Sequence, residues 1–288
     1  MIKNIALKGC GVKGILYAGS LSVLEEKGIL QGVERYAGVS AGSIVALLPV
    51  IGYNAKEIYD LVNSTDFKSF EDHINPIQLI EREGIHSGNN LLAWVRQVIT
   101  ARGFQADATF RDLHNMGCKD LYVFACGLKS GNVKRFSNLD TPNYSVAQAI
   151  RASAGIPIFF ETMQFTVPEN DPEIYVDGGT VYNYPIDFYD RFGSPSETLG
   201  LFPYNMSAPE PDRIMNKGNL LQFGKALFAA MLNSQDINTL SDLSATERTI
   251  KLDSLGISAT NFSLSDDQKI ALYNSGRDAT IKHFASLQ

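Results

Sequence analysis

Apolar positions along this chain follow two patterns, short continuous runs and longer segments with helical spacing. Short apolar runs bounded by glycine or polar residues are typical of strands buried in a sheet. Segments with an apolar residue at every third or fourth position, ended by glycine or proline, are typical of helices that pack on that sheet. The runs predict strands within residues 2–8, 34–40, 120–128, 133–138, 173–179 and 197–204, and the helical spacing predicts helices within 15–28, 40–53, 54–64, 88–103, 145–155 and 266–284.

The order of these elements predicts the fold class and the domain organisation. Strands alternate with helices, which favours an α/β layer fold with a mainly parallel sheet. No repeat, low-complexity tract or linker-like change in composition divides the chain, so we expect a single domain over residues 1–288. Its C-terminal part, about 205–288, is expected to be a helical extension or cap. Within it, we interpret the strongly apolar segment 219–235 as a buried core helix in preference to an interfacial lid.

Composition narrows the classes of partner and compartment. Among the 288 residues, 25 lysines and arginines stand against 31 acidic residues, for a net charge of −6. That balance argues against a broad basic surface for nucleic acid and against strong attraction to anionic lipids. Three cysteines without metal-ligand spacing indicate neither a disulfide framework nor a zinc site and favour a reducing compartment. We see no signal peptide and no apolar run of about 18 residues. We therefore expect a cytoplasmic protein, with export by a route without a cleavable signal as the alternative.

A Gly-x-Ser-x-Gly motif, Gly38-Val39-Ser40-Ala41-Gly42, lies between a predicted strand and a strongly apolar helix. A serine hydroxyl becomes a nucleophile when a base takes its proton and the backbone presents it to the substrate. Glycines two residues to either side leave room for a sharp strand-to-helix turn, and the positive end of the following helix lies beside the serine. We therefore interpret Ser40 as a candidate nucleophile, with a small-residue helix start as the alternative.

A glycine-rich loop, Gly9-Cys10-Gly11-Val12-Lys13-Gly14, follows the first predicted strand and opens the first helix. The amides of such a loop are suited to hold developing negative charge. The same Gly-x-Gly-x-x-Gly spacing also matches a dinucleotide-binding fingerprint, which requires an acidic residue near the end of the second strand. Glu34 stands at the beginning of that strand and Ser40 at its end. On spacing alone, both interpretations of the loop remain open.

Asp177 ends an apolar predicted strand directly before Gly178 and Gly179. Active-site residues of open parallel sheets gather at strand ends, so Asp177 is a candidate partner for Ser40, with an ordinary Asp-Gly-Gly turn as the alternative. A conventional order of serine, acid and histidine is formally available through His283, which lies in the terminal helix. The histidines carry no motif, and we interpret all four as surface or capping residues: His73, His86, His114 and His283.

Taken together, four blocks in order resemble the patatin-like phospholipase family. The glycine-rich loop is similar to the family's oxyanion loop, and residues 38–42 are similar to its nucleophile elbow. Residues 151–160, RASAGIPIFF, resemble its Arg-Ala-Ser block. The Asp-Gly-Gly sequence at 177–179, followed by Asn183 and Pro185, resembles the block that supplies its second catalytic residue. Each block alone is weakly specific, whereas their joint order within residues 5–185 is specific.

The resemblance implies a three-layer α/β/α fold with a mainly parallel central sheet, of the FabD/lysophospholipase-like type. It further implies a Ser-Asp dyad without histidine that cleaves fatty-acyl esters of phospholipids or lysophospholipids. By that analogy Asp177 takes the proton of Ser40, an acyl-enzyme forms on Ser40, and Asp177 then activates water. The oxyanion hole would lie within residues 9–14 with Ala41, chiefly at the amides of Gly11 and Val12. The remaining glycines of the motifs would support the elbow and the acid: Gly38, Gly42, Gly178 and Gly179.

That chemistry requires no cofactor and no metal. The expected partners are the lipid substrate and, transiently, a membrane surface, and the sequence names no activating protein. The family usually has glycine where this chain has Cys10 and arginine where it has Lys13. A Cβ at position 10 would strain the loop if that position needs a positive φ. Two further functions stay open, an acyltransferase that uses the same acyl-enzyme and a non-catalytic lipid-binding protein whose loop Cys10 has spoiled.

Overall fold

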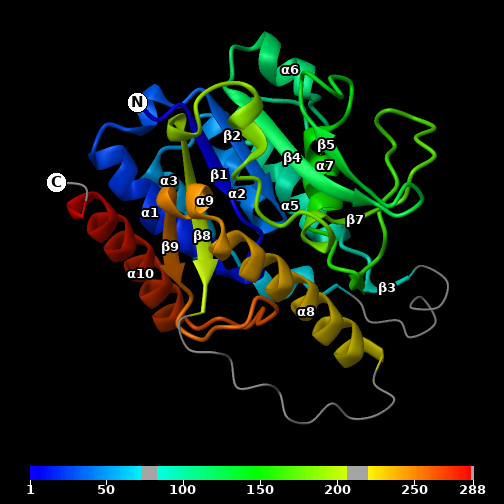
Figure 1. Ribbon diagram of the computed structural model, residues 1–288. Coiled ribbons are helices and arrows are strands. Elements are labelled where there is room, and N and C mark those ends of the chain that lie inside the picture. Colours follow the sequence, from blue (N-terminus) through cyan, green and yellow to red (C-terminus); the bar gives the residue numbers. More distant parts are fainter. Residues whose placement is uncertain (73–82, 206–219, 287–288) are drawn as a thin grey trace.

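The computed structural model describes residues 1–72, 83–205 and 220–286. Within them a seven-stranded central sheet has the order β5-β4-β2-β1-β8-β9, and β7 also pairs with β4 (Figure 1). The pairs that join β4, β2, β1, β8 and β9 are parallel, whereas β5 and β7 run antiparallel to β4. A separate pair, β3 with β6, is parallel. The strands are β1 (Asn4–Leu7), β2 (Arg35–Val39), β3 (Gly84–His86), β4 (Asp120–Gly127), β5 (Asn132–Phe136), β6 (Ile158–Phe160), β7 (Tyr175–Asp177), β8 (Thr198–Tyr204) and β9 (Thr249–Asp253).

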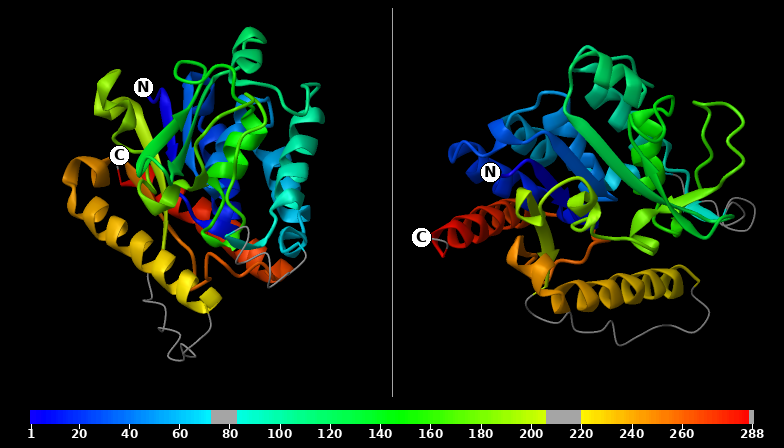
Figure 2. Two further views of the ribbon diagram at one scale, coloured as in Figure 1. Left: turned by 90° about the vertical axis from the view of Figure 1, so that its right-hand side faces the viewer. Right: turned by 45° about the horizontal axis from the view of Figure 1, so that its top comes forward.

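Helices cover both faces of this sheet (Figure 2). The α-helices are α1 (Ile15–Glu26), α2 (Ala41–Val50), α3 (Ala55–Ser64), α5 (Asn89–Thr100), α6 (Phe110–Asn115), α7 (Val146–Ser153), α8 (Leu220–Ser241), α9 (Leu243–Glu247) and α10 (Asp266–Ala285). The 3-10 helices are η1 (Gly11–Gly14), η2 (Leu30–Gly32), η3 (Phe67–Phe70), η4 (Gly178–Thr180), η5 (Phe188–Arg191) and η6 (Pro195–Glu197). None of the helices in these ranges combines the length and the apolar character required to cross a bilayer.

The pleat of each strand sends alternate side chains into different layers. Ile5 and Leu7 belong to the large core cluster, which also contains residues of α1, α2, α5, α7 and α10. Ala6, between them, packs on the opposite face with Phe202 of β8 and Ala245 of α9. The fold is therefore a three-layer α/β/α arrangement with a mainly parallel central sheet. The alternation of elements predicts the mainly parallel sheet, and the family resemblance implies the three layers.

Each predicted strand is present, and so is each helix predicted from helical spacing. The C-terminal part differs from the expected helical extension because β9 adds a parallel strand to the sheet beside β8. Ile250 and Leu252 alternate there with polar residues, a two-residue period that is typical of a strand and was available in the sequence. The extent of the domain over the whole chain stays a prediction.

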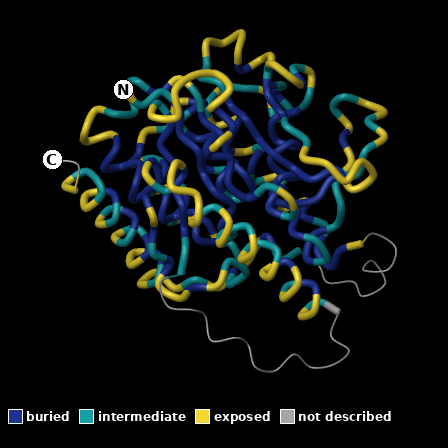
Figure 3. The backbone as a smooth tube through the Cα atoms, viewed as in Figure 1, coloured by how far each residue is buried: buried dark blue, intermediate teal, exposed yellow. Residues whose placement is uncertain are grey.

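The interpretation of segment 219–235 as a buried core helix is wrong. Residue 219 lies outside the described residues, and from residue 221 onward only Gly224 and Phe228 of this segment are buried. Phe223 and Leu227 are 52% and 50% exposed, and Figure 3 shows α8 as a largely exposed helix. The helix packs by one face against β6 and η4, so its apolar residues on the other face stay in contact with solvent.

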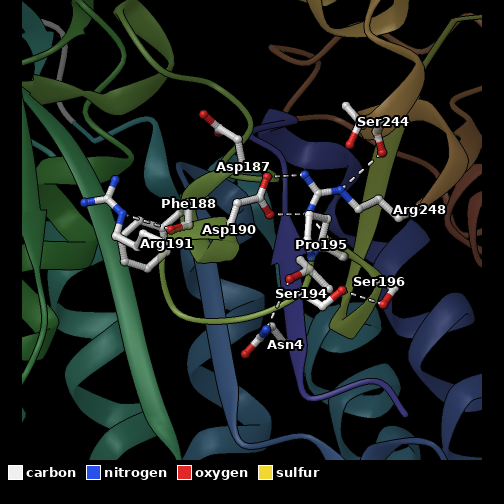
Figure 4. A network of polar contacts seen from close by, with 12 residues as sticks. Asn4, Asp187, Phe188, Asp190, Arg191, Ser194, Pro195, Ser196, Ser244 and Arg248 are labelled. Atoms are coloured by element: carbon white, nitrogen blue, oxygen red, sulfur yellow. Dashed lines mark hydrogen bonds and ion pairs between the residues drawn. The ribbon is translucent and has the colours of Figure 1, made fainter.

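Arg248 ties the C-terminal elements to the segment before β8 (Figure 4). Its guanidinium donates to both carboxylate oxygens of Asp190 in η5, at 2.5 and 2.7 Å, and to the carbonyl of Pro195 at 3.2 Å. Its Nε donates to the carbonyl of Ser244 in α9 at 3.2 Å. A planar guanidinium satisfies such a set of acceptors at once, so α9 and β9 are held against η5 and η6.

Candidate active site

Ser40 occupies a sharp turn between the last residue of β2 and the first residue of α2. Its backbone angles are φ 53° and ψ −130°, a conformation that costs a non-glycine residue about 1–3 kcal/mol. The flanking glycines permit the turn by close approach. A Cβ on Gly38 would lie 2.3 Å from the carbonyl oxygen of Gly42, and a Cβ on Gly42 would lie 2.5 Å from that of Leu7.

Ser153 holds the backbone of this turn. Its hydroxyl accepts a hydrogen bond from the amide of Ser40 at 2.9 Å and donates one to the carbonyl of Phe124 at 2.5 Å. The hydroxyl is buried and bridges α7, the turn after β2, and β4, so it satisfies polar groups that water does not reach. Ser153 lies inside the Arg-Ala-Ser block that the sequence analysis recognised, but motif matching assigned it no role.

Asp177 meets Ser40 because β2 and β7 approach each other end to end along one edge of β4. Val39 at the end of β2 pairs with Phe124, and Asp177 at the end of β7 pairs with the next residue, Ala125. Ser40 Oγ donates to Asp177 Oδ2 at 2.7 Å. The acid therefore lies on a strand that runs antiparallel to β4, and not on one of the parallel strands that the pattern predicts.

The carboxyl group of Asp177 is completely buried. Burial penalises its charged form and raises the pKa of Asp177 to about 7, although the hydrogen bonds from Ser40 and from the amide of Gly179, the latter at 2.7 Å, act in the opposite direction. A carboxyl group with such a pKa exchanges its proton near neutral pH, which is the range in which a general base works best.

The glycine-rich loop has its positive φ at Gly11, where φ is 59°, and not at Cys10, where φ is −146°. A Cβ on Gly11 would also lie 2.0 Å from the carbonyl oxygen of Ala259. Cys10 therefore fits the loop without the strain that a positive φ would impose. Burial raises the pKa of the Cys10 thiol to about 11, so the thiol stays protonated and weakly nucleophilic.

Several amides of this loop already have acceptors within the chain. The amide of Gly9 donates to the carbonyl of Asn183 at 3.0 Å, and that of Val12 donates to the carbonyl of Ala259 at 3.0 Å. Gly11 and Ala41 are the first residues of η1 and α2, so their amides have no partner within their own helices. Both residues line one cavity together with Ser40.

That cavity is apolar and runs from Ser40 between α2, α5 and the segment after α7. Its wall includes five aromatic side chains, contributed by Phe67, Phe70, Trp94, Phe160 and Phe262. Phe262 comes from the loop between β9 and α10 and stacks on Phe159, with ring centroids 4.9 Å apart. The shape and lining suit a flexible hydrocarbon chain next to the hydroxyl of Ser40.

Gln235 of α8 links both halves of the site. Its Nε2 donates to the carbonyl of Gly179 at 2.7 Å, and its Oε1 accepts from the amide of Asn183 at 2.8 Å. Gly179 in turn donates to Asp177, and Asn183 accepts from Gly9 of the loop. The neighbouring Asp236 forms an ion pair with Lys8 at 2.5 Å. Sequence analysis missed Gln235, and no motif marks it.

The alternative chemistries find little support in the described residues. Glu34 is exposed directly before β2 and forms an ion pair with Arg35 at 3.2 Å. A dinucleotide site requires an acidic residue near the end of that strand, and the residue that follows β2 is Ser40. His86 is buried in β3 and contacts the carbonyl of Asp72, contrary to its interpretation as a surface residue, and His283 lies on α10 against Phe284. His73 lies outside the described residues. No group of three or more histidine, cysteine, aspartate or glutamate side chains in the described ranges is placed to hold a metal ion.

Comparison with known proteins places these features in a family. The model of the family described as "Patatin-like phospholipase" matches residues 5–189. The chain is 29% identical over 289 residues to the uncharacterized protein YqhO of Bacillus subtilis, with 94% of each chain covered. It is 25% identical over 192 residues to the probable lipid hydrolase 463L of Invertebrate iridescent virus 6, with 66% of this chain and 64% of that protein covered.

Solved structures share the fold at low sequence identity. VipD from Legionella pneumophila matches with a TM-score of 0.63 and 18% identity over 99% of this chain and 67% of that one. Human GIVD cytosolic phospholipase A2 matches with a TM-score of 0.55 and 12% identity over 100% of this chain and 59% of that one. This chain thus spans roughly three fifths to two thirds of the length of those two proteins.

The family match and the lipid-hydrolase relative both support a lipolytic activity. The match covers more than half of the chain and includes the elbow, the glycine-rich loop and the Asp-Gly-Gly block. The chain belongs to the patatin-like phospholipase family.

Proposed function

We propose that this protein is a serine acyl hydrolase that cleaves fatty-acyl esters of phospholipids or lysophospholipids through a dyad of Ser40 and Asp177. The observation that carries the proposal is the 2.7 Å hydrogen bond from Ser40 Oγ to the buried carboxyl of Asp177. It stands at a strained turn beside an apolar cavity. No histidine is needed in this scheme, because a carboxylate with a pKa of about 7 is itself a competent base.

In the first half of the reaction, the ionised Asp177 takes the proton of Ser40 as Ser40 Oγ attacks the ester carbonyl. The carbonyl oxygen then carries a negative charge that needs hydrogen-bond donors. The amides of Gly11 and Ala41 are the donors we assign, because both residues line the cavity and lead their helices. The protonated Asp177 returns its proton to the leaving alcohol, and the acyl group remains as an ester on Ser40.

In the second half, Asp177 takes a proton from water, which attacks the acyl-enzyme. The ester bond to Ser40 breaks, the proton returns to Ser40 Oγ, and the fatty acid leaves. The aromatic lining of the cavity holds the acyl chain throughout. The amide of Val12, which the sequence analysis favoured as a donor, serves only if the carbonyl of Ala259 releases it.

Labelling with a fluorophosphonate, located by mass spectrometry of the intact and digested protein, tests this proposal. We expect one label, on Ser40, that is absent from Ser40→Ala and at least about 100-fold slower to form in Asp177→Asn. Cys10→Ala is the matched control and is expected to label at the rate of the native chain, because the thiol of Cys10 is buried and protonated. A label on any other residue, or none on a folded native chain, would contradict the dyad.

Fatty-acid release from phosphatidylcholine and lysophosphatidylcholine then identifies the ester that is cleaved. Added glycerol distinguishes water from an alcohol as the acceptor, because an acyltransferase would produce acylglycerol in place of free fatty acid. The third function, a non-catalytic lipid-binding protein, was motivated by strain at Cys10. The ordinary φ of −146° at that residue removes this motive. The cytoplasmic location and the absence of a cofactor remain predictions.

A further inference from the structure

The outer face of α8 is exposed, mainly apolar and without charge. Phe223, Leu227 and Ile237 are 52%, 50% and 66% exposed, and Ala226 and Ala230 between them are also exposed. Their spacing places all five on one side of the helix. The remaining side carries the contacts with the protein, through Gly224, Phe228 and Gln235.

The charged residues of α8 do not lie on this outer face. Its 22 residues include one cation and one anion, Lys225 and Asp236. The ammonium group of Lys225 lies 5.0 Å from the ring centroid of Phe159, and Asp236 pairs with the buried Lys8. Apolar surface of this extent that is bordered by few charges is typical of a face that enters an apolar environment.

The outer face borders a surface groove beside the turn that follows Asp177. A surface groove between η4 and α8 is lined by Thr180 and Val181 on one side and by Ala230, Ser234 and Gln235 on the other. Gly178 and Gly179 of η4 directly follow Asp177. A lipid held along α8 therefore lies beside η4, the turn that directly follows the proposed base. Figures 1 and 2 show α8 as an outlying helix beyond the carboxyl end of β8.

We infer that the outer face of α8 is the surface by which the protein docks on a lipid layer, with Phe223, Leu227 and Ile237 inserted between the lipids. The inference rests on the proposed lipid substrate, which is supplied from such a layer. The uncharged face and the net charge of −6 fit a zwitterionic lipid surface, because neither provides electrostatic attraction to an anionic one. Docking by this face is therefore driven by apolar contact and is insensitive to salt.

Flotation with large vesicles of pure phosphatidylcholine measures this docking without turnover, in the full-length Ser40→Ala protein. The test variant adds Phe223→Ser and Leu227→Ser. The matched control adds Ile270→Ser and Ile281→Ser on α10, two residues of similar exposure at 47% and 45%. We expect the vesicle partition coefficient to fall by at least about tenfold in the test variant and to stay unchanged in the control. Thermal unfolding by circular dichroism verifies that both variants are folded.

Three results would overturn the inference. One is that the α8 variant floats as well as its parent. Another is that flotation requires about 20 mol% anionic lipid and vanishes in high salt. Alternatively, light scattering would show a dimer of the parent that the α8 substitutions dissociate, which would assign the face to a second copy of the chain.

Activity measurements separate failure of this inference from failure of the proposed function. With Ser40 intact, the α8 variant is expected to hydrolyse a water-soluble short-chain ester at the native rate and phosphatidylcholine vesicles more slowly. If no variant hydrolyses any ester, the proposed function fails, while flotation still decides the role of α8. Equal loss on both substrates would refute docking by this face.

Discussion

At the scale of single residues, the candidate site is built from groups held in unfavourable states. Ser40 has a positive φ, and Asp177 is buried without a cation among its hydrogen-bond partners in the described residues. Both states reduce stability, and both make the groups more reactive, because the turn places Ser40 in the wall of the cavity and burial makes the carboxylate more basic. Proteins commonly concentrate such costs at functional sites.

The pKa of Asp177 predicts how labelling of Ser40 depends on pH. Below the pKa of about 7 the carboxyl group is protonated and cannot accept the proton of Ser40, so the rate constant of fluorophosphonate labelling should rise with pH and level off above that value. Stopped-flow labelling between about pH 5 and 9 measures the profile. The slow residual labelling of Asp177→Asn should lack this titration. A rate that is flat or that falls across this range would refute Asp177 as the base.

The same pKa predicts a pH-dependent gain in stability for Asp177→Asn. The folded pKa of about 7 exceeds 3.8, the ordinary pKa of an aspartate side chain, so the native state binds more protons than the unfolded state between these values and its stability falls as pH rises. Asparagine does not ionise. The difference in free energy of unfolding between Asp177→Asn and the native chain should therefore favour the variant more at pH 8 than at pH 4, by at most about 4 kcal/mol. Urea unfolding at both pH values measures the difference. An equal difference at both values would contradict the raised pKa.

At the scale of elements, α8 supports the site from outside the region that the family model matches, residues 5–189. Gln235 fixes the carbonyl of Gly179 and the amide of Asn183, so one side chain orients the turn after Asp177 and the loop at Gly9. We assign it the role of a positioning residue, since it acts on the reacting groups through others.

Gln235→Met is expected to lower kcat by about tenfold with little change in KM, because the two hydrogen bonds hold the catalytic geometry and do not bind substrate. Gln235→Glu keeps the acceptor for Asn183 but loses the donor to Gly179. Its kcat should therefore lie between that of Gln235→Met and that of the native protein. Asn238→Met, at an exposed position of the same helix, is the matched control. Steady-state kinetics on a soluble ester measures all three variants. An unchanged kcat in Gln235→Met would remove this role.

At the scale of the whole molecule, the first and last helices are joined by a close crossing. A Cβ on Gly19 of α1 would lie 2.0 Å from the carbonyl oxygen of Tyr273, and a Cβ on Gly276 of α10 would lie 2.1 Å from that of Leu16. Ser20 Oγ donates to the carbonyl of Gly276 at 3.3 Å. The two helices thus touch through their backbones, so the C-terminal region is part of the same core as the N-terminal motifs.

Gly276→Ala is expected to lower the free energy of unfolding by about 1–3 kcal/mol, because the added methyl group forces α1 and α10 apart. This loss would exceed the gain of about 1 kcal/mol that alanine gives in a helix. Gly32→Ala is the control, since its Cβ would find its nearest atom at 3.4 Å. Urea unfolding compares the variants. Equal stability of Gly276→Ala and the native chain would show that the crossing tolerates separation.

Much of the fold and part of the site could be predicted from the sequence because they depend on neighbouring residues. The alternation of strands and helices, the glycines around Ser40 and the turn after Asp177 are local patterns, and the structure contains each of them. β9 was missed although its two-residue period was present in the sequence. The catalytic roles of Ser40 and Asp177 remain proposals.

The sequence by itself determined which segments form strands and helices, and where a serine and an acid stand at their ends, because each of these features follows from residues within a few positions. Only the tertiary structure decided that Ser40 and Asp177, 137 residues apart, share a hydrogen bond. It also decided that the carbonyl of Ala259 accepts the hydrogen bond of the Val12 amide and that the apolar side of α8 faces solvent. These features arise from the packing of distant segments against one another, which no local pattern encodes.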